Sequence, residues 1–325
     1  MTAADHHVAL GIDVGGTKTL IGLVDAGGTV LAQREWPTRD AERSVSDVDH
    51  LGNMVEQSVH ELGQEGSPYA NLTIVAVGAG FPEYVDAAGQ LTSSEVISWQ
   101  QQPAAVLTEV AERALGSAAA QVPVRVESDV RAGAIGEVLF GAARDASSFV
   151  YVSLGTGLSS AIGVNGVVLP GHRGEAIALG EWPVSGADID LLGATNLEQY
   201  ASGAGLSARF ALLTGEQVET REIASRALLL PGTEHDFLSD AGRVLARALD
   251  SIVSFIDPER IILGGGLGTA EGVLADALDA EYAALLARRP GSPALVRAQN
   301  GPLSGLLGAA ATGWAAVQQK TTPGN

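Results

Sequence analysis

Three glycine-rich turns in this sequence could cradle a phosphate group. Each follows an apolar stretch, and they read Gly15-Gly16-Thr17-Lys18, Gly155-Thr156-Gly157 and Gly264-Gly265-Gly266. Glycine lets the backbone approach a phosphate closely and direct successive N–H groups at it. A single turn of this kind is more often structural. Three of them, each at the end of an apolar strand, predict a nucleotide site.

Two charged residues flank the first turn and could complete such a site. Asp13 ends the preceding apolar strand, and a buried carboxylate requires a partner. We expect that partner to be Mg²⁺, bound directly or through water. Lys18 is one of two lysines, the other being Lys320 in the C-terminal tail. Its ammonium can neutralise phosphate oxygens, and a structural salt bridge is the alternative.

Asp129 is the candidate general base. It follows a strand expected over 122–127 and precedes a helix expected over 132–140. A carboxylate there can accept the proton of a substrate hydroxyl while a P–O bond forms. Asp is also a preferred N-cap residue. Both interpretations can hold, since a helix start can orient a carboxylate.

Two common nucleotide motifs are absent from the sequence. A P-loop needs Lys after its second glycine, and Thr17 follows Gly16 here. A dinucleotide fingerprint needs a third glycine that opens a helix, but Ser160 stands at that position, within an expected strand. The glycine turns therefore indicate another kind of nucleotide-binding fold.

The elements that must position these turns occur in the same order twice. Strand, glycine turn, strand, tight turn and strand follow one another, and Ala26-Gly27-Gly28 and Asn165-Gly166 supply the tight turns. The two series of strands are expected over 8–14, 19–25 and 29–36, and over 149–154, 159–164 and 167–169. We interpret them as a duplicated β-hairpin core, one copy in each lobe.

Apolar periodicity predicts the remaining elements. Further strands are expected over 72–78 and 260–263. Helices are expected over 44–62, 103–115, 237–256 and 304–317, and Asp257-Pro258 ends the third of these. We expect one lobe over 1–117, completed by a C-terminal helix over 304–318, and a nucleotide-binding lobe over 118–303.

Composition excludes several classes of function. The chain has 325 residues, 46% of them hydrophobic, with no cysteine and a formal net charge of −19. Disulfides, thiol nucleophiles and Cys-based zinc sites are excluded, and the acidity argues against nucleic acid as a partner. No apolar run is long enough for a membrane span, and residues 1–7 are polar. We therefore expect a cytoplasmic protein.

Five segments resemble the ROK family (repressor, ORF, kinase) of the actin-like ATPase superfamily. Asp13 to Lys18 resembles its first phosphate motif, Ser153 to Gly157 its second, and Asp257 to Gly266 its adenosine motif. Segments 197–203 and 305–310 also look like the family and stand in the expected order. Together they cover nearly the whole chain.

The resemblance implies an α/β fold with two lobes of actin-like, ribonuclease-H-like topology and ATP in the cleft between them. It implies ATP and Mg²⁺ as cofactors and closure on a sugar, which excludes water. Asp129 matches the catalytic Asp of the family, which precedes a Gly-Glu and a Phe-Gly, here Gly136-Glu137 and Phe140-Gly141. We also expect a homodimer.

Four positions depart from the pattern of the family's sugar site. The family has Asn before the catalytic Asp, Asn before a Trp, and a Glu and a His in a Gly-Glu-x-Gly-His segment. This chain has, in that order, Ser128, Glu95, Ala178 and Glu181. The cysteines of the family's zinc loop are missing from 185–196 too, so we expect no zinc site.

These departures point to a changed acceptor, because a site built for one set of hydroxyls leaves polar groups unpaired with another. Glu95 and Glu181 could pair with an amine on the substrate, or they could be solvated. Ala178 stands where the family grips the anomeric end. It suits an acceptor without an anomeric hydroxyl, such as a cyclitol.

The leading hypothesis is an ATP-dependent kinase that phosphorylates a hydroxyl group of an amino sugar, a C7-cyclitol or another sugar-like small molecule. We expect this hydroxyl to be a primary one. A glucokinase of ordinary hexose specificity and a non-catalytic sugar-binding ROK protein are the alternatives. A repressor would carry a helix-turn-helix segment before the first phosphate motif, and we expect none before Asp13. The phosphoryl donor could also be polyphosphate, which some relatives use.

Overall fold

The computed structural model describes residues 7–42, 44–63, 67–115, 122–176, 178–184, 191–229, 231–289, 291 and 293–321. The chain forms two compact units, each with its own sheet. The first comprises Met1–Arg144, Pro170–Ala176 and Leu303–Asn325, and the second comprises Asp145–Leu169 and Ile177–Pro302.

The first unit is built on a five-stranded sheet in the order β3-β2-β1-β4-β5. Strands β1, β2 and β3 form antiparallel hairpins, whereas β4 and β5 run parallel to β1. Their bounds are β1 His7–Val14, β2 Lys18–Asp25, β3 Val30–Pro37, β4 Thr73–Phe81 and β5 Val124–Ser128. The carboxyl ends of β1, β4 and β5 therefore meet at one edge of the sheet.

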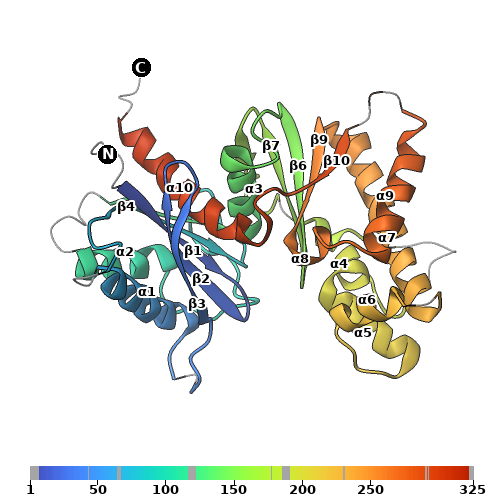
Figure 1. The fold of residues 1–325 in the computed structure, drawn as a ribbon, viewed down its shortest axis with the longest axis horizontal. Helices are drawn as coiled ribbons and strands as arrows, with labels where there is room; N and C mark the ends of the chain where they lie inside the picture. Colours follow the sequence, from blue (N-terminus) through green and yellow to red (C-terminus); the bar gives the residue numbers. More distant parts are fainter. Residues whose placement is uncertain are drawn as a thin grey trace. The chain divides into compact units, whose positions relative to one another are not determined.

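Alternation along β1 assigns its two faces to different helices. Even-numbered apolar residues such as Leu10 and Ile12 join the core formed with α1 (Asp47–Gly63) and α2 (Pro103–Leu115). Ala9 packs in a separate cluster against α10 (Ser304–Thr321), which lies along the sheet in Figure 1. Because side chains in a strand alternate with a period of two, Asp13 is directed to the same face as Ala9.

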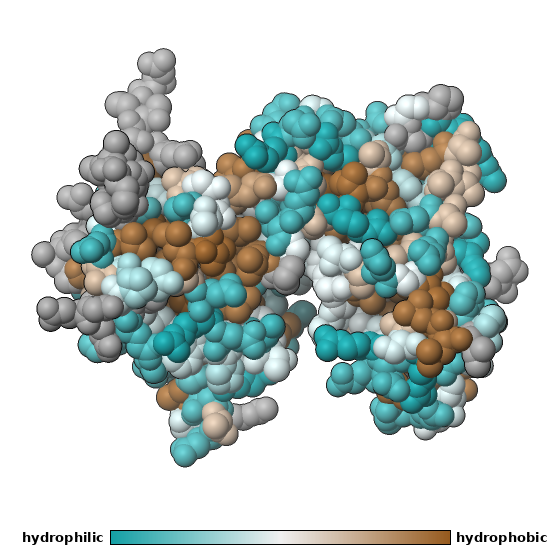
Figure 2. Space-filling view, in the orientation of Figure 1, coloured by the Kyte–Doolittle hydropathy of each residue, from teal (hydrophilic) through white to brown (hydrophobic). Residues whose placement is uncertain are grey.

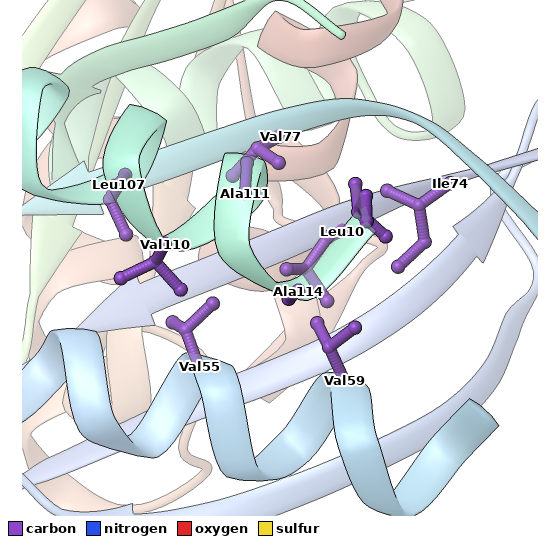
Figure 3. Close-up of a pocket in the computed structure, with 10 residues that line it drawn as sticks. Leu10, Val55, Val59, Ile74, Val77, Leu107, Val110, Ala111 and Ala114 are labelled. Carbon is purple, nitrogen blue, oxygen red and sulfur yellow. The ribbon is translucent and has the colours of Figure 1, made fainter. Parts of the chain in front are cut away.

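The core between α1 and α2 closes almost completely. Figure 3 shows apolar side chains from both helices and from β1 and β4 pointing at one another around a cavity of about 10 Å³. A space of this size holds at most one water, and an apolar lining offers that water no hydrogen bonds. The cavity is therefore a packing defect and not a ligand site.

The second unit repeats the topology of the first. Its sheet has the order β10-β9-β6-β7-β8, with β6, β7 and β8 antiparallel and with β9 and β10 parallel to β6. The bounds are β6 Ser148–Leu154, β7 Leu158–Val164, β8 Val167–Leu169, β9 Arg260–Gly264 and β10 Ala294–Arg297. The duplicated β-hairpin core predicted from the sequence is confirmed.

The tight turn of the second hairpin has the predicted chemistry. Asn165 and Gly166 both have left-handed backbones, with φ of 50° and 77°. Two successive positive φ values define the turn whose twist matches paired antiparallel strands, and Asn-Gly is the preferred pair for it.

Helices cover the second sheet and complete its core. They are α4 Leu197–Ala201, α5 Gly203–Thr214, α6 Thr220–Ala227, α7 Thr233–Ile256, α8 Gly265–Gly268 and α9 Val273–Leu286. The long helix α7 was predicted, and it ends where Asp257 takes φ 51° before Pro258. Helices α4, α5, α6, α8 and α9 and strand β10 were not predicted.

The lobe boundary expected between residues 117 and 118 lies outside the described residues. The elements that follow, β5 and α3 (Asp129–Phe140), belong to the first unit, because β5 pairs with β4 and α3 packs against α10. Within the described residues, no helix is both long and apolar enough to cross a bilayer.

Candidate functional site

The carboxyl edge of the first sheet gathers the acidic residues of the site. In the register of the parallel strands, Asp13 pairs with Gly80 and Phe81 pairs with Ser128. Asp129 is the next residue along the chain. A Cβ placed on Gly80 would lie 3.5 Å from the Cα of Asp129. The strand ends therefore bring Asp13 and Asp129 to the same place.

Asp13 lies against the beginning of α10. A Cβ placed on Gly305 would come within 2.5 Å of Oδ2 of Asp13, so only glycine fits beside this carboxylate. Burial raises the pKa of Asp13 to about 6, and the positive charge of Lys18 lowers it. The partial positive charge of the helix N-terminus also favours the ionised form.

Asp129 is the first residue of α3, and the N-cap is Ser128. The hydroxyl of Ser128 accepts a hydrogen bond from the backbone N–H of Arg131 at 3.4 Å. The sequence hypothesis that Asp129 caps the helix was therefore wrong by one residue. Because Ser128 is fully buried and serves as the cap, the carboxylate of Asp129 is not needed for capping.

The environment of Asp129 disfavours its charged form. Burial raises its pKa to about 7, and the negative charges of Asp13 and Glu83 add to this effect. A hydrogen bond at 2.6 Å from the N–H of Val130 to Oδ1 acts in the opposite direction. A carboxyl with a pKa near neutrality can both accept and release a proton under ordinary conditions.

The first glycine turn is held from outside by two residues that follow β3. Thr38 donates its hydroxyl to the carbonyl of Gly15 at 2.7 Å, and Arg39 donates Nη1 to the carbonyl of Gly16 at 2.6 Å. With these carbonyls engaged, the orientation of the turn is fixed. Thr17 in this turn is exposed.

Lys18 pairs with Glu35, with Nζ 2.9 Å from Oε2. The register sets Lys18 opposite Pro37, so Glu35, two residues along β3, is its diagonal neighbour on the same face. Both side chains are more than half exposed, 62% and 56%. Pairs of this kind contribute about 0–1 kcal/mol to stability.

Sequence reasoning missed Glu83, which follows β4 by two residues. Its carboxylate is buried and accepts hydrogen bonds from the backbone N–H groups of Glu95, Val96 and Ile97 at 3.0, 2.7 and 2.9 Å. The hydroxyl of Ser93 donates to it as well. A lone Glu after a proline gives no sequence signal, because its partners lie 10–14 residues further along the chain.

The loop over 93–97 borders a pocket of about 310 Å³ in the first unit. Glu95 is exposed and lines this pocket together with Arg39, Asp47 and other residues of the loop. The volume is at the lower end of the range for small-molecule sites.

In the second unit, the turn 155–157 is held by neighbouring helices. The N–H groups of Gly203 and Ala204, at the start of α5, donate to the carbonyls of Gly155 and Thr156 at 2.8 and 3.0 Å. Glu198 accepts from the N–H of Leu158 at 2.8 Å. Glu198 is a second residue that the sequence did not identify.

The third glycine turn, 264–266, lies beside the second one. Gly264 ends β9 and pairs in register with Ser153 on β6. The N atom of Gly266 would be 3.9 Å from a Cβ placed on Gly155. Two of the three predicted phosphate turns therefore share one edge of the second sheet, with Gly265 in the first turn of α8.

Ala178 and Glu181 lie next to the same edge of the second unit. The short 3₁₀ segment Leu179–Glu181 follows Ala178, and Gly180 approaches the carbonyl of Leu158. Ala178 is half-buried. Glu181 is exposed and accepts a hydrogen bond from Nδ2 of Asn196 at 3.2 Å.

No cluster of three potential metal ligands occurs among the described side chains. Residues 185–190, half of the stretch where the zinc cysteines are missing, lie outside them, and the absence of zinc stays a prediction. The carboxylate of Asp13 is a suitable ligand for Mg²⁺, because no donor within the described parts of the chain hydrogen-bonds to it. Mg²⁺ commonly takes one or two carboxylates and completes its shell with phosphates and water.

Comparison with known proteins gives consistent matches along the chain. The model of the ROK family matches residues 9–315. The bifunctional enzyme NanE/NanK of Brucella melitensis is 32% identical over 307 residues, which are 93% of this chain and 53% of that protein. The chain thus spans about half the length of that relative. A glucokinase of Streptomyces coelicolor is 31% identical, over 93% of this chain and 96% of its own.

Solved structures give the same result for the fold. A ROK hexokinase from Thermus thermophilus superposes with a TM-score of 0.76 at 27% identity, covering 96% of this chain and 99% of its own. A ROK family glucokinase from Streptomyces griseus, in complex with glucose and AMPPNP, gives a TM-score of 0.72 at 28% identity, covering 93% and 98%.

Proposed function

Because the chain belongs to the ROK family, with an actin-like ATPase fold, we propose that it is an ATP-dependent kinase of a sugar or sugar-like small molecule. It would transfer the γ-phosphoryl group of ATP to a hydroxyl, and a primary hydroxyl is the proposed acceptor. The observation that supports this best is the carboxyl of Asp129, half-buried at the carboxyl edge of the first sheet beside Asp13, with a pKa raised to about 7.

Asp129 acts in this proposal as the general base. Its ionised carboxylate accepts the proton of the acceptor hydroxyl while the oxygen of that hydroxyl forms a bond to the γ-phosphorus and the bond to the β-phosphate breaks. Positioning and charge stabilisation supply most of the rate enhancement in phosphoryl transfer. The general base adds to this rate enhancement by accepting the proton of the hydroxyl, which a group with a pKa near neutrality does well at neutral pH.

The glycine turns are proposed to bind the nucleotide. In the second unit, the backbones of turns 155–157 and 264–266 lie side by side, and their glycines let a phosphate approach backbone N–H groups closely. In the first unit, the turn 15–18 adds Lys18. Bound Mg²⁺ would neutralise charge on the phosphates, and Asp13 would hold it directly or through water.

Lys18→Ala is expected to raise the KM for ATP by about tenfold, because a cation leaves the phosphates. The free energy of unfolding should change by less than about 1 kcal/mol, since the exposed pair with Glu35 adds little stability. Steady-state kinetics and urea denaturation measure the two effects. Glu35→Ala is the matched control, because it breaks the same ion pair and leaves the ammonium in place.

Unchanged kinetics in Lys18→Ala would assign the residue to the salt bridge alone. Equal rises of KM in the two variants would assign the effect to the lost pair and not to the phosphate contact.

The proposed acceptor is an amino sugar or a C7-cyclitol. Glu95 borders the pocket in the first unit with an exposed carboxylate that can pair with an amine. Ala178 offers no polar group to an anomeric hydroxyl. Glu181 is engaged with Asn196 and Ser128 caps α3, so among the four departures Glu95 and Ala178 are the better candidates for direct selection.

Restoring the family residues should shift specificity toward glucose. In Ala178→Glu and Glu95→Asn, kcat/KM for glucose is expected to rise and kcat/KM for the preferred acceptor to fall, by roughly 10- to 150-fold for a charge-assisted pair. Competition assays with both acceptors measure the change. A wild-type enzyme that already prefers glucose would refute the acceptor proposal and leave the kinase proposal standing.

Two alternatives concern the same site. The relatives from Streptomyces are glucokinases, which favours an ordinary hexose as acceptor. A non-catalytic sugar-binding protein would keep the fold without turnover. A coupled assay of ADP release over glucose, mannose, amino sugars and C7-cyclitols, with polyphosphate as a second donor, distinguishes them. Turnover with none of these acceptors would refute the kinase proposal.

A homodimer is part of the proposal, and it is supported by exposed apolar side chains on the second unit. Figure 2 shows a hydrophobic patch near α6 and α7. Leu228 and Leu229, which follow α6, are 66% and 77% exposed. Sedimentation of the purified protein gives its mass in solution.

A further inference from the structure

The loop 93–97 is wound around a single buried carboxylate. The carboxylate of Glu83 accepts hydrogen bonds from three consecutive backbone N–H groups and one hydroxyl of the loop, and Glu83 is only 5% exposed. Hydrogen bonds to an ionised acceptor are about twice as strong as neutral ones. Without Glu83, the loop would have three N–H groups that no other residue of the loop satisfies.

Arg39 holds the same loop from its other side. Nη2 donates to the carbonyl of Val96 at 2.7 Å, while Nη1 donates to the carbonyl of Gly16 at 2.6 Å. One guanidinium thus joins the loop to the first glycine turn. The planar fork of Arg suits two acceptors in fixed directions, which a Lys ammonium does not reproduce.

Direct packing also joins the loop and the turn. A Cβ placed on Gly16 would come within 3.0 Å of Cγ1 of Val96. The side chain of Val96 therefore rests on the backbone of Gly16. A shift of the loop by a fraction of an ångström changes the space beside this turn.

The loop also lies on the side of the sheet edge where Asp129 is found. Glu83 follows the end of β4, whose last residue, Phe81, pairs with Ser128 next to Asp129. The loop that Glu83 orders therefore extends from the neighbourhood of the base to the glycine turn. Glu95, with its exposed carboxylate over the pocket, stands in the middle of it.

We propose that Glu83 and Arg39 are positioning residues, which fix the loop 93–97 for the acceptor and couple its position to the nucleotide turn Gly15-Gly16. This proposal rests on the kinase function proposed above. Glu83 acts first on the acceptor side, through the N–H groups of the loop, and reaches the nucleotide turn only indirectly, through the packing of Val96 on Gly16. Arg39 acts on both substrates, because its two donors reach the loop and the turn.

The two residues predict different kinetic signatures. Glu83→Gln keeps the shape but turns one acceptor oxygen into a donor facing N–H groups. Measured at pH 8, where the base is ionised with or without the charge of Glu83, it should raise the KM of the acceptor about tenfold or more. The kcat and the KM of ATP should stay within about threefold. Arg39→Gln should raise both KM values, and Arg39→Lys should recover part of this loss. Arg113→Gln, which breaks an exposed ion pair in the same unit, is the control and should change neither.

A double-mutant cycle and amide hydrogen exchange complete the test. If both residues act through one loop, their effects on the acceptor KM will be non-additive. Exchange at Val96 and Ile97 should accelerate in Glu83→Gln, an outcome that does not depend on turnover. If Glu83→Gln does not fold, Arg39→Gln and Arg39→Lys, at a half-exposed site, carry the test alone.

The outcomes separate the two proposals. Faster exchange in Glu83→Gln with an unchanged acceptor KM would overturn the positioning role and leave the kinase standing. Unchanged exchange and unchanged KM values would overturn it as well. A wild-type protein that phosphorylates no carbohydrate or cyclitol would overturn both proposals, even where exchange at the loop responds.

Discussion

Asp129→Asn is expected to lower turnover by at least about 100-fold, the usual contribution of a positioned base. Asn has the same shape and can still accept the hydrogen bond from Val130, but it cannot take a proton from a hydroxyl. Ser128 caps α3, so the substitution leaves the cap intact. ATP affinity should change little. Single-turnover phosphoryl transfer, measured at saturating acceptor, isolates the loss in the chemical step.

A matched control is Asp236→Asn, which replaces an exposed carboxylate in the first turn of α7 by the same amide. It should retain wild-type turnover. If Asp129→Asn does so as well, the carboxylate has no role in proton transfer, and the kinase would need another base or none.

The pH dependence of activity and stability in the wild type and in Asp129→Asn tests independently whether Asp129 is the general base. Because the base must be ionised and its pKa is about 7, kcat/KM of the wild type should rise with pH through this value. The raised pKa has the opposite effect on stability: the protonated group favours folding, and this contribution is lost as pH rises from about 4 to about 7. Asp129→Asn should therefore melt no lower than the wild type at pH 8.

The repeated β-hairpin could be predicted from the sequence because its signals are local. Glycine turns, alternating apolar residues and Asn165-Gly166 act within a few residues of one another. Helix α5 (Gly203–Thr214) was missed because its apolar residues do not gather on one face, and its start is set by the N-cap Ser202. The N-cap of α3 was assigned to Asp129 instead of Ser128 because Ser and Asp are both preferred at this position, so the sequence does not choose between adjacent residues.

The contacts that organise the site could not be read from spacing. Glu83 meets the N–H groups of a loop that begins ten residues later, and only the folded loop brings them together. The pair between Lys18 and Glu35 depends on the register of β2 and β3. In both cases tertiary structure chooses among many partners that the sequence allows equally.

The crossing of α3 and α10 supports the whole carboxyl edge of the first sheet. Gly308 on α10 lies directly against the backbone of Ala132 on α3, where a Cβ would overlap the carbonyl group and lie 2.9 Å from the N of Gly133. The same two helices begin at Asp129 and near Gly305, beside Asp13. Any separation of the helices therefore moves both carboxylates of the site.

Gly308→Ala should consequently destabilise the protein and impair catalysis. Overpacking against a backbone that cannot give way costs typically 1–3 kcal/mol and occasionally more, and we expect about 3 kcal/mol by urea denaturation. Gly313→Ala on the same helix is the milder comparison. Its Cβ would meet the Cβ of Ala76 at 3.1 Å and backbone atoms of Val77 and Gly78 at 3.3 Å, so shifts of a few tenths of an ångström suffice, whereas the overlap at Gly308 requires far more. Both variants gain about 1 kcal/mol of helix propensity, so their difference isolates the overlap. Turnover of the folded fraction should fall only in Gly308→Ala. Equal stability of the two variants would mean that α3 and α10 adjust freely, and that their close approach does not set the distance between Asp13 and Asp129.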